Sequence, residues 1–193
     1  FILGIIFGSF FNVVGLRLPQ QQSFTKGRSH CPHCHTPLKS YELIPVISYL
    51  LQLGKCRHCR QPISIIYPIT ELLTGCLFAL SYVLIGLNVE LIVALLLMSM
   101  LMILFVSDLS YMIIPNKVLL FFLPLFIVLR FIEPLTPWVS SVTGAVVGFG
   151  LIAVIILIRN GGLGAGDMKL FGVLGILLVL KNILVTFYHA TII

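Results

Sequence analysis

The sequence predicts an all-α polytopic membrane protein with about six or more transmembrane helices and a small cytoplasmic zinc-ribbon-like insertion. Hydrophobic residues make up 59% of the 193 residues and charged residues only 9%, a balance far from that of soluble domains. Several apolar runs approach the roughly 20 residues that a helix needs to cross the hydrocarbon core of a bilayer. The polar stretch after the first run carries two C-x2-C pairs, which predict the metal-binding insertion.

The apolar runs give the order of the predicted transmembrane helices. The first run, 1–16, is about one turn too short, and because it does not open with Met we expect the sequence to begin inside this helix. It lacks the basic start and the small-residue cleavage site of a signal peptide. The next four runs are 63–87, 91–107, 113–131 and 139–158. The end is predicted as a short helix, 170–180, and the start of another, 183–193, with a single bent helix as the alternative.

The basic residues predict the orientation, because Lys and Arg stay on the cytoplasmic side of a membrane. Ten of the twelve fall in the first, third and fifth loops: Arg17, Lys26, Arg28, Lys39, Lys55, Arg57, Arg60, Lys117, Arg159 and Lys169. Only Arg130 and Lys181 fall on the other side. Two crossings separate the first loop from Asp108, and two more separate Asp108 from Asp167. The loop and both aspartates are therefore predicted to face the cytoplasm.

Asp108 and Asp167 are the only aspartates, and each adjoins an apolar run, where a carboxylate is costly and usually functional. Two carboxylates that meet can share one proton, so that one activates water while the other donates to the developing oxyanion. This pair is the minimal machinery of an aspartyl protease. The structural alternatives are an N-cap role for Asp167 and a solvated loop or turn position for Asp108.

Glycines surround Asp167 in GGLGAGDMK, residues 161–169. Residues without a Cβ atom let an extended peptide backbone approach closely, which makes Gly164 and Gly166 candidate supporting residues. Lys169 could tune the charge of Asp167 or extend to lipid headgroups. At the start of the following helix, the helix dipole favours an anionic Asp167, whereas partial burial in lipid raises its pKa, and the sequence does not decide between the two.

The second group of candidate site residues is two cysteine pairs, CPHC at 31–34 and CRHC at 56–59, with twenty-one residues between the pairs. Four thiolates at this spacing predict a structural zinc site. The predicted ligands are Cys31, Cys34, Cys56 and Cys59. Two disulfides or a redox pair are the alternatives, although cytoplasmic thiols stay reduced. Four neighbouring histidines could substitute as ligands: His30, His33, His35 and His58.

Zinc would also supply folding free energy to the loop, whose apolar patch at 43–51 is small. Residues 17–60 hold seven basic groups against Glu42 alone, so the loop stays basic even after a zinc ion with four thiolates is counted. We therefore expect anionic membrane lipid as its neighbour. No nucleic acid is expected, because neither a recognition helix nor interleaved aromatic residues are visible.

Together these motifs resemble those of the bacterial type IV prepilin peptidases, GxGD aspartyl proteases that include the competence-type leader peptidases. The similarity runs almost end to end. The matching blocks are GSFFNVVGLRLP at 8–19, the two C-x2-C pairs, YELIPVISYL at 41–50, GKCRHC at 54–59, YPITELLTG at 67–75, DLSYMIIPN at 108–116 and GAGDMKLF at 164–171. One departure is Ile66, where such proteins often carry a basic residue.

The resemblance implies a membrane-embedded aspartyl endopeptidase of the bacterial inner membrane. Members remove short basic leaders from pilin-like precursors at the cytoplasmic face, after a glycine and before a hydrophobic helix. The family's catalytic pair maps onto Asp108 and Asp167, and its zinc-type motif onto the four cysteines. Many members also methylate the new amino terminus with S-adenosylmethionine, although the sequence shows no local signature of such a site.

Three polar residues in the matching blocks are further candidates, each with a structural alternative. Asn12 could position the precursor or form a hydrogen bond between helices. Glu42 and Glu71 could attract the basic leader or pair with a lysine or arginine of the loop.

The predicted organisation is a first transmembrane helix at 1–16, a cytoplasmic tetracysteine zinc-binding loop at 17–62 and a transmembrane catalytic domain at 63–193 that carries both aspartates. Two alternatives come from other functional classes. A non-catalytic assembly scaffold would dock through the zinc loop, and an ion-coupled transporter would use the aspartates as ion ligands.

Overall fold

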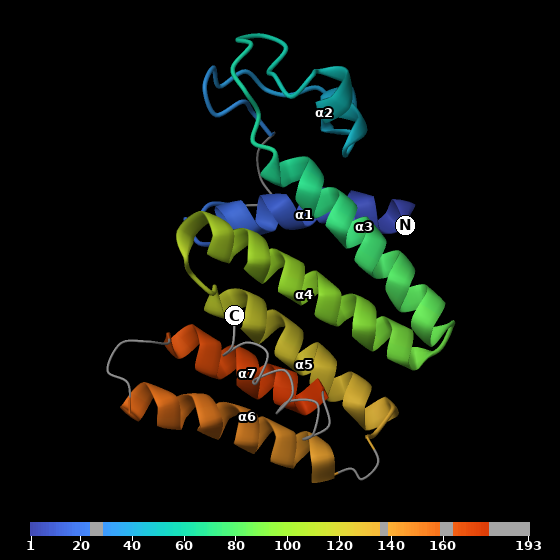
Figure 1. Cartoon of the computed structure of the whole chain (residues 1–193), viewed down its shortest axis with the longest axis vertical. Coiled ribbons are helices and arrows are strands. Elements are labelled where there is room, and N and C mark those ends of the chain that lie inside the picture. Colours follow the sequence, from blue (N-terminus) through green and yellow to red (C-terminus); the bar gives the residue numbers. More distant parts are fainter. Residues whose placement is uncertain (24–28, 136–138, 159–163, 178–193) are drawn as a thin grey trace. The chain divides into compact units, whose positions relative to one another are not determined.

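The computed structural model describes residues 1–23, 29–135, 139–158 and 164–177, and its regular elements there are all helical. In chain order they are α1 (Ile2–Arg17), the 3-10 helix η1 (Ser40–Leu43), α2 (Ile47–Leu51), α3 (Ile66–Ile85), α4 (Val89–Tyr111), α5 (Asn116–Ile132), α6 (Val139–Ile158) and α7 (Ala165–Leu177), as Figure 1 shows. No strand is present in these ranges, only two isolated bridges, His30 with Pro37 and Lys55 with Pro62. The chain divides into two compact units, 1–112 and 113–193.

Helices lie where the apolar runs predict them, but two boundaries differ in ways that concern the aspartates. α4 continues to Tyr111, four residues beyond its predicted end, and so includes Asp108. α7 starts at Ala165, five residues before its predicted start, and so includes Asp167. Both shifts occur because an aspartate in a terminal turn can hydrogen-bond to water or to the backbone and need not end the helix. The predicted last segment, 183–193, and the bent-helix alternative lie outside the described residues.

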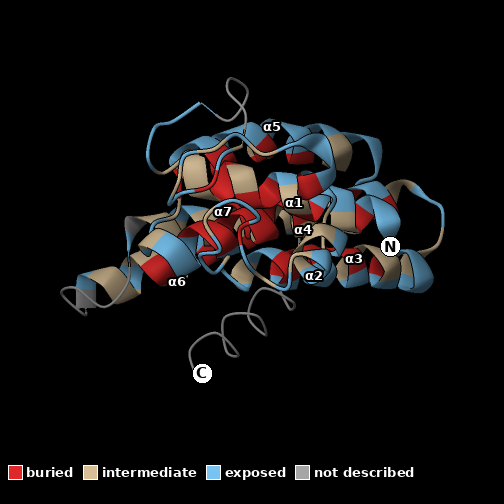
Figure 2. Ribbon diagram, turned by 90° about the horizontal axis from the view of Figure 1, so that it is seen from above, coloured by how far each residue is buried: buried red, intermediate tan, exposed pale blue. Residues whose placement is uncertain are grey.

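Two of the described helices, α3 and α4, are long and apolar enough to cross a membrane. α1 and the part of α6 at 141–157 are shorter apolar helices. Large apolar side chains are exposed along these helices, among them Leu3 of α1 and Leu84 of α3. Figure 2 colours the exposed stretches of the helices pale blue. Such surfaces are expected where the surrounding solvent is lipid.

In the first unit, α1 lies beside α3 and α4 (Figure 1). Glycines allow this approach. A Cβ atom on Gly4 would lie 2.8 Å from the Cα of Gly75, and one on Gly8 would lie 2.9 Å from the Cα of Glu71. Close packing through small residues is how apolar helices associate in membranes.

In the second unit, α7 lies against α6 and α5. Gly175 of α7 rests on the backbone of Gly144 and Ala145 of α6, which leaves no space for a side chain. Arg130 near the end of α5 donates from Nη2 to the carbonyl of Leu177, the last residue of α7, at 2.8 Å. Arg130 therefore lies at the end of α7 opposite to Asp167.

Candidate functional site

Asp108 lies in the last turn of α4 with its side chain exposed. The N–H of Met112 donates to the carbonyl of Asp108 at 2.8 Å, and Met112 itself adopts a φ of +52°. A methionine rarely takes this left-handed conformation, yet here it ends the helix four residues after the aspartate. The alternative of a loop position for Asp108 is therefore wrong, because α4 continues through it.

Asp167 is the third residue of α7, and its carboxylate caps the N-terminus of that helix. The backbone N–H of Gly164 donates to Asp167 Oδ2 at 3.0 Å, while the N–H of Asp167 donates to the carbonyl of Gly164 at 3.0 Å. A side chain at the third helical position that binds the N–H of the residue before the helix is one half of a capping box. Gly164, and not Asp167, thus occupies the N-cap position, and within the described part of the chain this hydrogen bond uses one of the two carboxylate oxygens.

The residues on either side of Asp167 contact the segment that follows the Asp108 motif. A Cβ atom on Gly166 would lie 2.9 Å from the Cβ of Ile114, and Lys169 Nζ donates to Asn116 Oδ1 at 3.1 Å. A Cβ atom on Gly164 would meet only Asp167 Oδ2, at an ordinary 3.5 Å. Packing therefore requires a glycine at 166, whereas the space beside 164 is open.

Asn116 was not predicted as a site residue. Its only signal in the sequence is its place directly after Pro115, at the start of an apolar run. Its partner Lys169 was expected to tune Asp167 or to reach lipid, and instead its ammonium group contacts the start of α5.

The four predicted zinc ligands come together in the loop between α1 and α3. The sulfur atoms of Cys31, Cys34, Cys56 and Cys59 all lie within 4.8 Å of one another, and those of Cys31 and Cys59 are 3.8 Å apart. With Zn–S bonds of about 2.3 Å, a tetrahedral zinc ion has S–S edges of about 3.8 Å. The donor set and its dimensions therefore fit a tetrahedral metal ion.

The two cysteine pairs form two copies of one backbone turn, offset by 25 residues. In the first copy, the N–H of Cys31 donates to the carbonyl of Thr36, and the N–H of His35 donates to the carbonyl of Cys31. In the second copy, Cys56 takes the place of Cys31, Gln61 that of Thr36, and Arg60 that of His35. His35 and Arg60 also share a left-handed backbone, with φ of +54° and +58°. The pattern behind this repeat, CPHCHTP and CRHCRQP, is visible in the sequence but was not used in the prediction.

Hydrogen-bond donors in these turns favour thiolates. The hydroxyl and backbone N–H of Thr36 lower the pKa of Cys34 to about 6, and backbone donors, that of Cys59 first, lower the pKa of Cys56. At Cys59 the backbone N–H of Gln61 also favours the thiolate, but burial and the neighbouring sulfurs outweigh it and raise the pKa to about 11. A cation among the sulfurs would remove this repulsion.

Two of the alternatives for the cysteines, disulfides and histidine ligands, are not what the structure shows. All five cysteines are free thiols, so neither pair forms a disulfide. Among the described residues, the cluster contains the four cysteines and none of the four histidines.

Asn12 is 1% exposed and joins α1 to α3. Its Nδ2 donates to the carbonyl of Tyr67 at 3.3 Å, and its Oδ1 accepts from the Thr70 hydroxyl at 2.6 Å. This is the interhelical hydrogen bonding that the sequence left open as the alternative for Asn12.

Glu42 and Glu71 are both buried, each 6% exposed, and both bind backbone N–H groups of the loop. Glu42 Oε2 accepts from Lys39 at 2.8 Å, and Glu71 Oε2 accepts from Val46 at 2.7 Å. Val46 has a φ of +61°, a costly conformation for a β-branched residue, and Glu71 fixes it against α3. One of the two alternatives for these glutamates, an ion pair with a lysine or arginine of the loop, is not formed among the described residues. Glu42 Oε1 is buried, and no described residue hydrogen-bonds to it.

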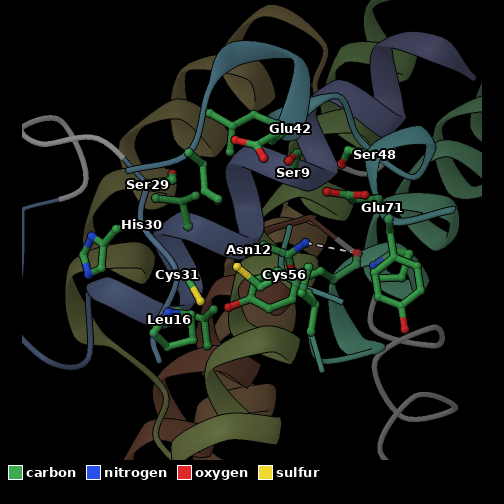
Figure 3. A pocket seen from close by; sticks show the side chains of 18 of the residues that line it. Ser9, Asn12, Leu16, Ser29, His30, Cys31, Glu42, Ser48, Cys56 and Glu71 are labelled. Atoms are coloured by element: carbon green, nitrogen blue, oxygen red, sulfur yellow. Dashed lines mark hydrogen bonds between the residues drawn. The ribbon is translucent and has the colours of Figure 1, made fainter. Parts of the chain in front are cut away.

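The two glutamates line a cavity of about 410 Å³ enclosed by α1, the start of α3, the end of α4 and the tetracysteine loop. Figure 3 shows Glu42, Ser9, Ser48 and Glu71 along one side of it, with Asn12 nearby. Its charged lining residues are Arg17, Glu42 and Glu71, and its aromatic lining residues are Tyr49, Tyr67 and Tyr111. The sequence did not predict this cavity, because its walls come from four separate segments of the chain.

Two family models match the chain, one in each half. Residues 2–85 match the family model for the bacterial peptidase A24 N-terminal domain, and residues 95–193 match that for the type IV leader peptidase family. No solved structure matches the chain.

Three curated relatives are named prepilin leader peptidase/N-methyltransferase. The relative from Bacillus subtilis is 44% identical over 193 residues, which cover 100% of this chain and 78% of the relative. The relative from Myxococcus xanthus is 38% identical over 189 residues, 95% of this chain and 56% of the relative. The relative from Klebsiella pneumoniae is 36% identical over 186 residues, 91% of this chain and 82% of the relative.

Long apolar helices, an aspartate at the start of a helix after glycines and a cluster of four cysteines define a helical membrane protein of the aspartic peptidase class. The chain belongs to the type IV leader peptidase family. The resemblance in the sequence motifs is thereby confirmed.

Proposed function

We propose that the protein is a membrane-embedded aspartyl endopeptidase that removes the short basic leader from type IV pilin-like precursors, with Asp108 and Asp167 as its catalytic pair. The observation that carries this proposal is the contact of the Asp167 motif with the segment after Asp108. Ile114 and Asn116, six and eight residues after Asp108, contact Gly166 and Lys169. Six residues of chain span at most about 20 Å, so this contact limits how far Asp108 can be from Asp167.

In the proposed reaction the two carboxylates share one proton. The anionic aspartate takes a proton from water as the water attacks the peptide carbonyl, and the protonated aspartate donates to the oxygen that becomes negative. The Gly164 N–H donates to Asp167 Oδ2 and holds this carboxylate at the start of α7, while Asp108 lies on an exposed helix end.

The proposed setting is the bacterial inner membrane, with six or more crossings and the active site at the cytoplasmic face. The distribution of basic residues supports this orientation, as does the position of Arg130 at the end of α7 away from Asp167. The apolar helix of the precursor would enter from the bilayer and place its Gly-to-hydrophobic bond between the aspartates. The open space beside Gly164 would admit its backbone.

The loop is proposed to hold a structural zinc ion through Cys31, Cys34, Cys56 and Cys59, and to rest on anionic membrane lipid. Leu50 and Leu51 of α2 are 64% and 78% exposed, and Leu53, just after the C-cap residue, is 85% exposed. The predicted small core of the loop is therefore an apolar surface. Exposed basic residues of the second cysteine turn, Lys55, Arg57 and Arg60, supply charge for anionic headgroups.

We also propose that the protein methylates the new amino terminus with S-adenosylmethionine. The names of the relatives support this second activity.

The test of the peptidase proposal is cleavage of a full-length precursor in detergent by Asp108→Asn and Asp167→Asn single variants. Each is expected to lose at least about 100-fold in turnover, because asparagine can neither take up nor release the proton. Zinc content and melting temperature serve as controls for folding. Near-normal turnover by either variant would overturn the proposal. A scaffold predicts that both variants still function in assembly in cells. A transporter predicts ion flux in liposomes without proteolysis.

A further inference from the structure

Gly15 of α1 lies in direct contact with α4 just before Asp108. The two helices lie side by side (Figure 1). A Cβ atom on Gly15 would lie 2.8 Å from both Cβ and Cγ1 of Val106 and 2.9 Å from the carbonyl oxygen of Ile103. All three residues are buried. Because carbon atoms pack best at about 3.5–4.0 Å, any side chain at position 15 would displace one of the two helices.

The contact involves the part of α4 that supports Asp108. Val106 and Ser107 are both 0% exposed, whereas Asp108 is exposed, so burial of the helix ends at the aspartate. In an α-helix the carbonyl of Ile103 accepts the N–H of the residue four positions later, which is Ser107. A shift of that carbonyl therefore moves the turn that leads into Asp108.

The opposite side of α1 is fixed by α3. Asn12 hydrogen-bonds to the carbonyl of Tyr67 and to the hydroxyl of Thr70, and a Cβ atom on Gly8 would lie 2.9 Å from the backbone of α3. Hydrogen bonds and close contacts through small residues are what hold apolar helices together in a membrane. Since α1 is held in place by these contacts, a larger residue at Gly15 displaces the end of α4.

We propose that Gly15 is a positioning residue of the peptidase reaction, because it lets α1 approach the last buried turn of α4 and so sets the position of the Asp108 carboxylate. The inference rests on the proposed catalytic role of Asp108. Gly15 contacts no reacting atom and acts through Val106 and Ile103. A displacement of about 1 Å in a catalytic group can cost about 100-fold in rate, and a change felt only by that group lowers kcat and leaves KM unchanged.

The first test compares precursor cleavage in detergent by Gly15→Ala and Gly4→Ala. At either position a Cβ atom would lie 2.8 Å from an atom of the neighbouring helix, so the two variants should lose similar stability. Gly4 lies eleven positions before Gly15, about 16 Å along the helix. Gly15→Ala should lower kcat by about tenfold to a hundredfold with KM within about twofold, whereas Gly4→Ala should keep kcat within about twofold. Zinc content and melting temperature report folding.

A second pair of variants makes the opposite change, and it decides the question if Gly15→Ala does not fold. Val106→Ala and Val93→Ala both remove buried atoms from α4, where the two side chains are 0% and 3% exposed. Val106 contacts Gly15, so its truncation leaves the turn before Asp108 without support. Val106→Ala should lower kcat by about tenfold, and Val93→Ala should keep kcat within about twofold.

Asp108→Asn in the same assay separates this inference from the proposed function. Near-normal turnover by Asp108→Asn would reject the peptidase proposal and the inference with it. If Asp108→Asn is inactive while Gly15→Ala and Val106→Ala keep the kcat of the wild type, the inference alone is overturned. Equal losses of kcat within each pair, with Gly4→Ala or Val93→Ala as impaired as its partner, would indicate a general packing role and overturn it. A raised KM with unchanged kcat would assign Gly15 to precursor binding and overturn it as well.

Discussion

A Cβ atom on Gly166 would lie 2.9 Å from the Cβ of Ile114, so the glycine beside Asp167 is packed directly against the segment that follows the Asp108 motif. Packing therefore explains the glycine at 166 but not the glycine at 164. The contact also holds the start of α7 against Ile114, which lies six residues after Asp108.

The first prediction contrasts these two glycines. Gly166→Ala should push α7 away from Ile114 and destabilise the second unit by about 1–3 kcal/mol, the usual effect of overpacking, with a matching loss of precursor turnover. Gly164→Ala meets only an ordinary contact and should keep the wild-type melting temperature. If its turnover nevertheless falls, the precursor backbone passes beside residue 164; equal stability of both variants would contradict the packing assignment.

The second prediction concerns the approach of the two aspartates. A protein with Asp108→Cys and Asp167→Cys, in a Cys76→Ser background, should be cross-linked within one chain by a short bismaleimide. The control pair, Asp108→Cys with Glu133→Cys, should not react, because α5 runs from Asn116 to Ile132 and a helix of that length is about 25 Å long. Mass spectrometry of proteolytic fragments identifies the link. Absence of a 108–167 link under conditions that modify both cysteines would count against the catalytic pair.

The third prediction concerns the metal. Purified protein should carry about one zinc ion per chain, and Cys34→Ser or Cys59→Ser should lose it. Because the loop has little buried apolar surface, metal loss should expose residues 17–62 to proteases, seen as rapid cleavage in a time course. Cys76→Ser, a change of the exposed cysteine outside the cluster, should keep both zinc and protease resistance. A protease-resistant loop after complete chelation would show that the metal does not order it.

The fourth prediction places the exposed apolar surface of the loop in lipid. Leu51→Trp, in a Trp138→Phe background, should be quenched by brominated lipids when the protein is in anionic vesicles. In neutral vesicles the quenching should be weaker, because Lys55, Arg57 and Arg60 then lack a partner. Equal, negligible quenching in both would show that Leu51 faces water or another part of the protein.

The sequence predicted the helices and the grouping of the four cysteines well because both depend on local patterns. Apolar runs of sufficient length form helices in lipid whatever surrounds them, and the spacing within each C-x2-C pair allows both sulfurs to bind one ion. The ends of α4 and α7 were less predictable. Asp108 was expected at the end of its helix and Asp167 at the start of the next, although the apolar runs stop short of both. Each lies inside a terminal turn, where its backbone joins the helix.

Taken alone, the sequence determined the class of protein, the order of the apolar helices, the two aspartates and the four cysteines, because residue type and spacing carry that information along the chain. Tertiary structure decided the roles of residues whose partners are distant in sequence. It placed Glu42 and Glu71, candidates for attracting a basic leader or for ion pairs with loop cations, as buried walls of a cavity. It gave Gly166 its partner Ile114, just before α5, and Lys169 its partner Asn116, at the start of α5. Burial and contact across 25 to 53 residues depend on how helices pack, which no local pattern encodes.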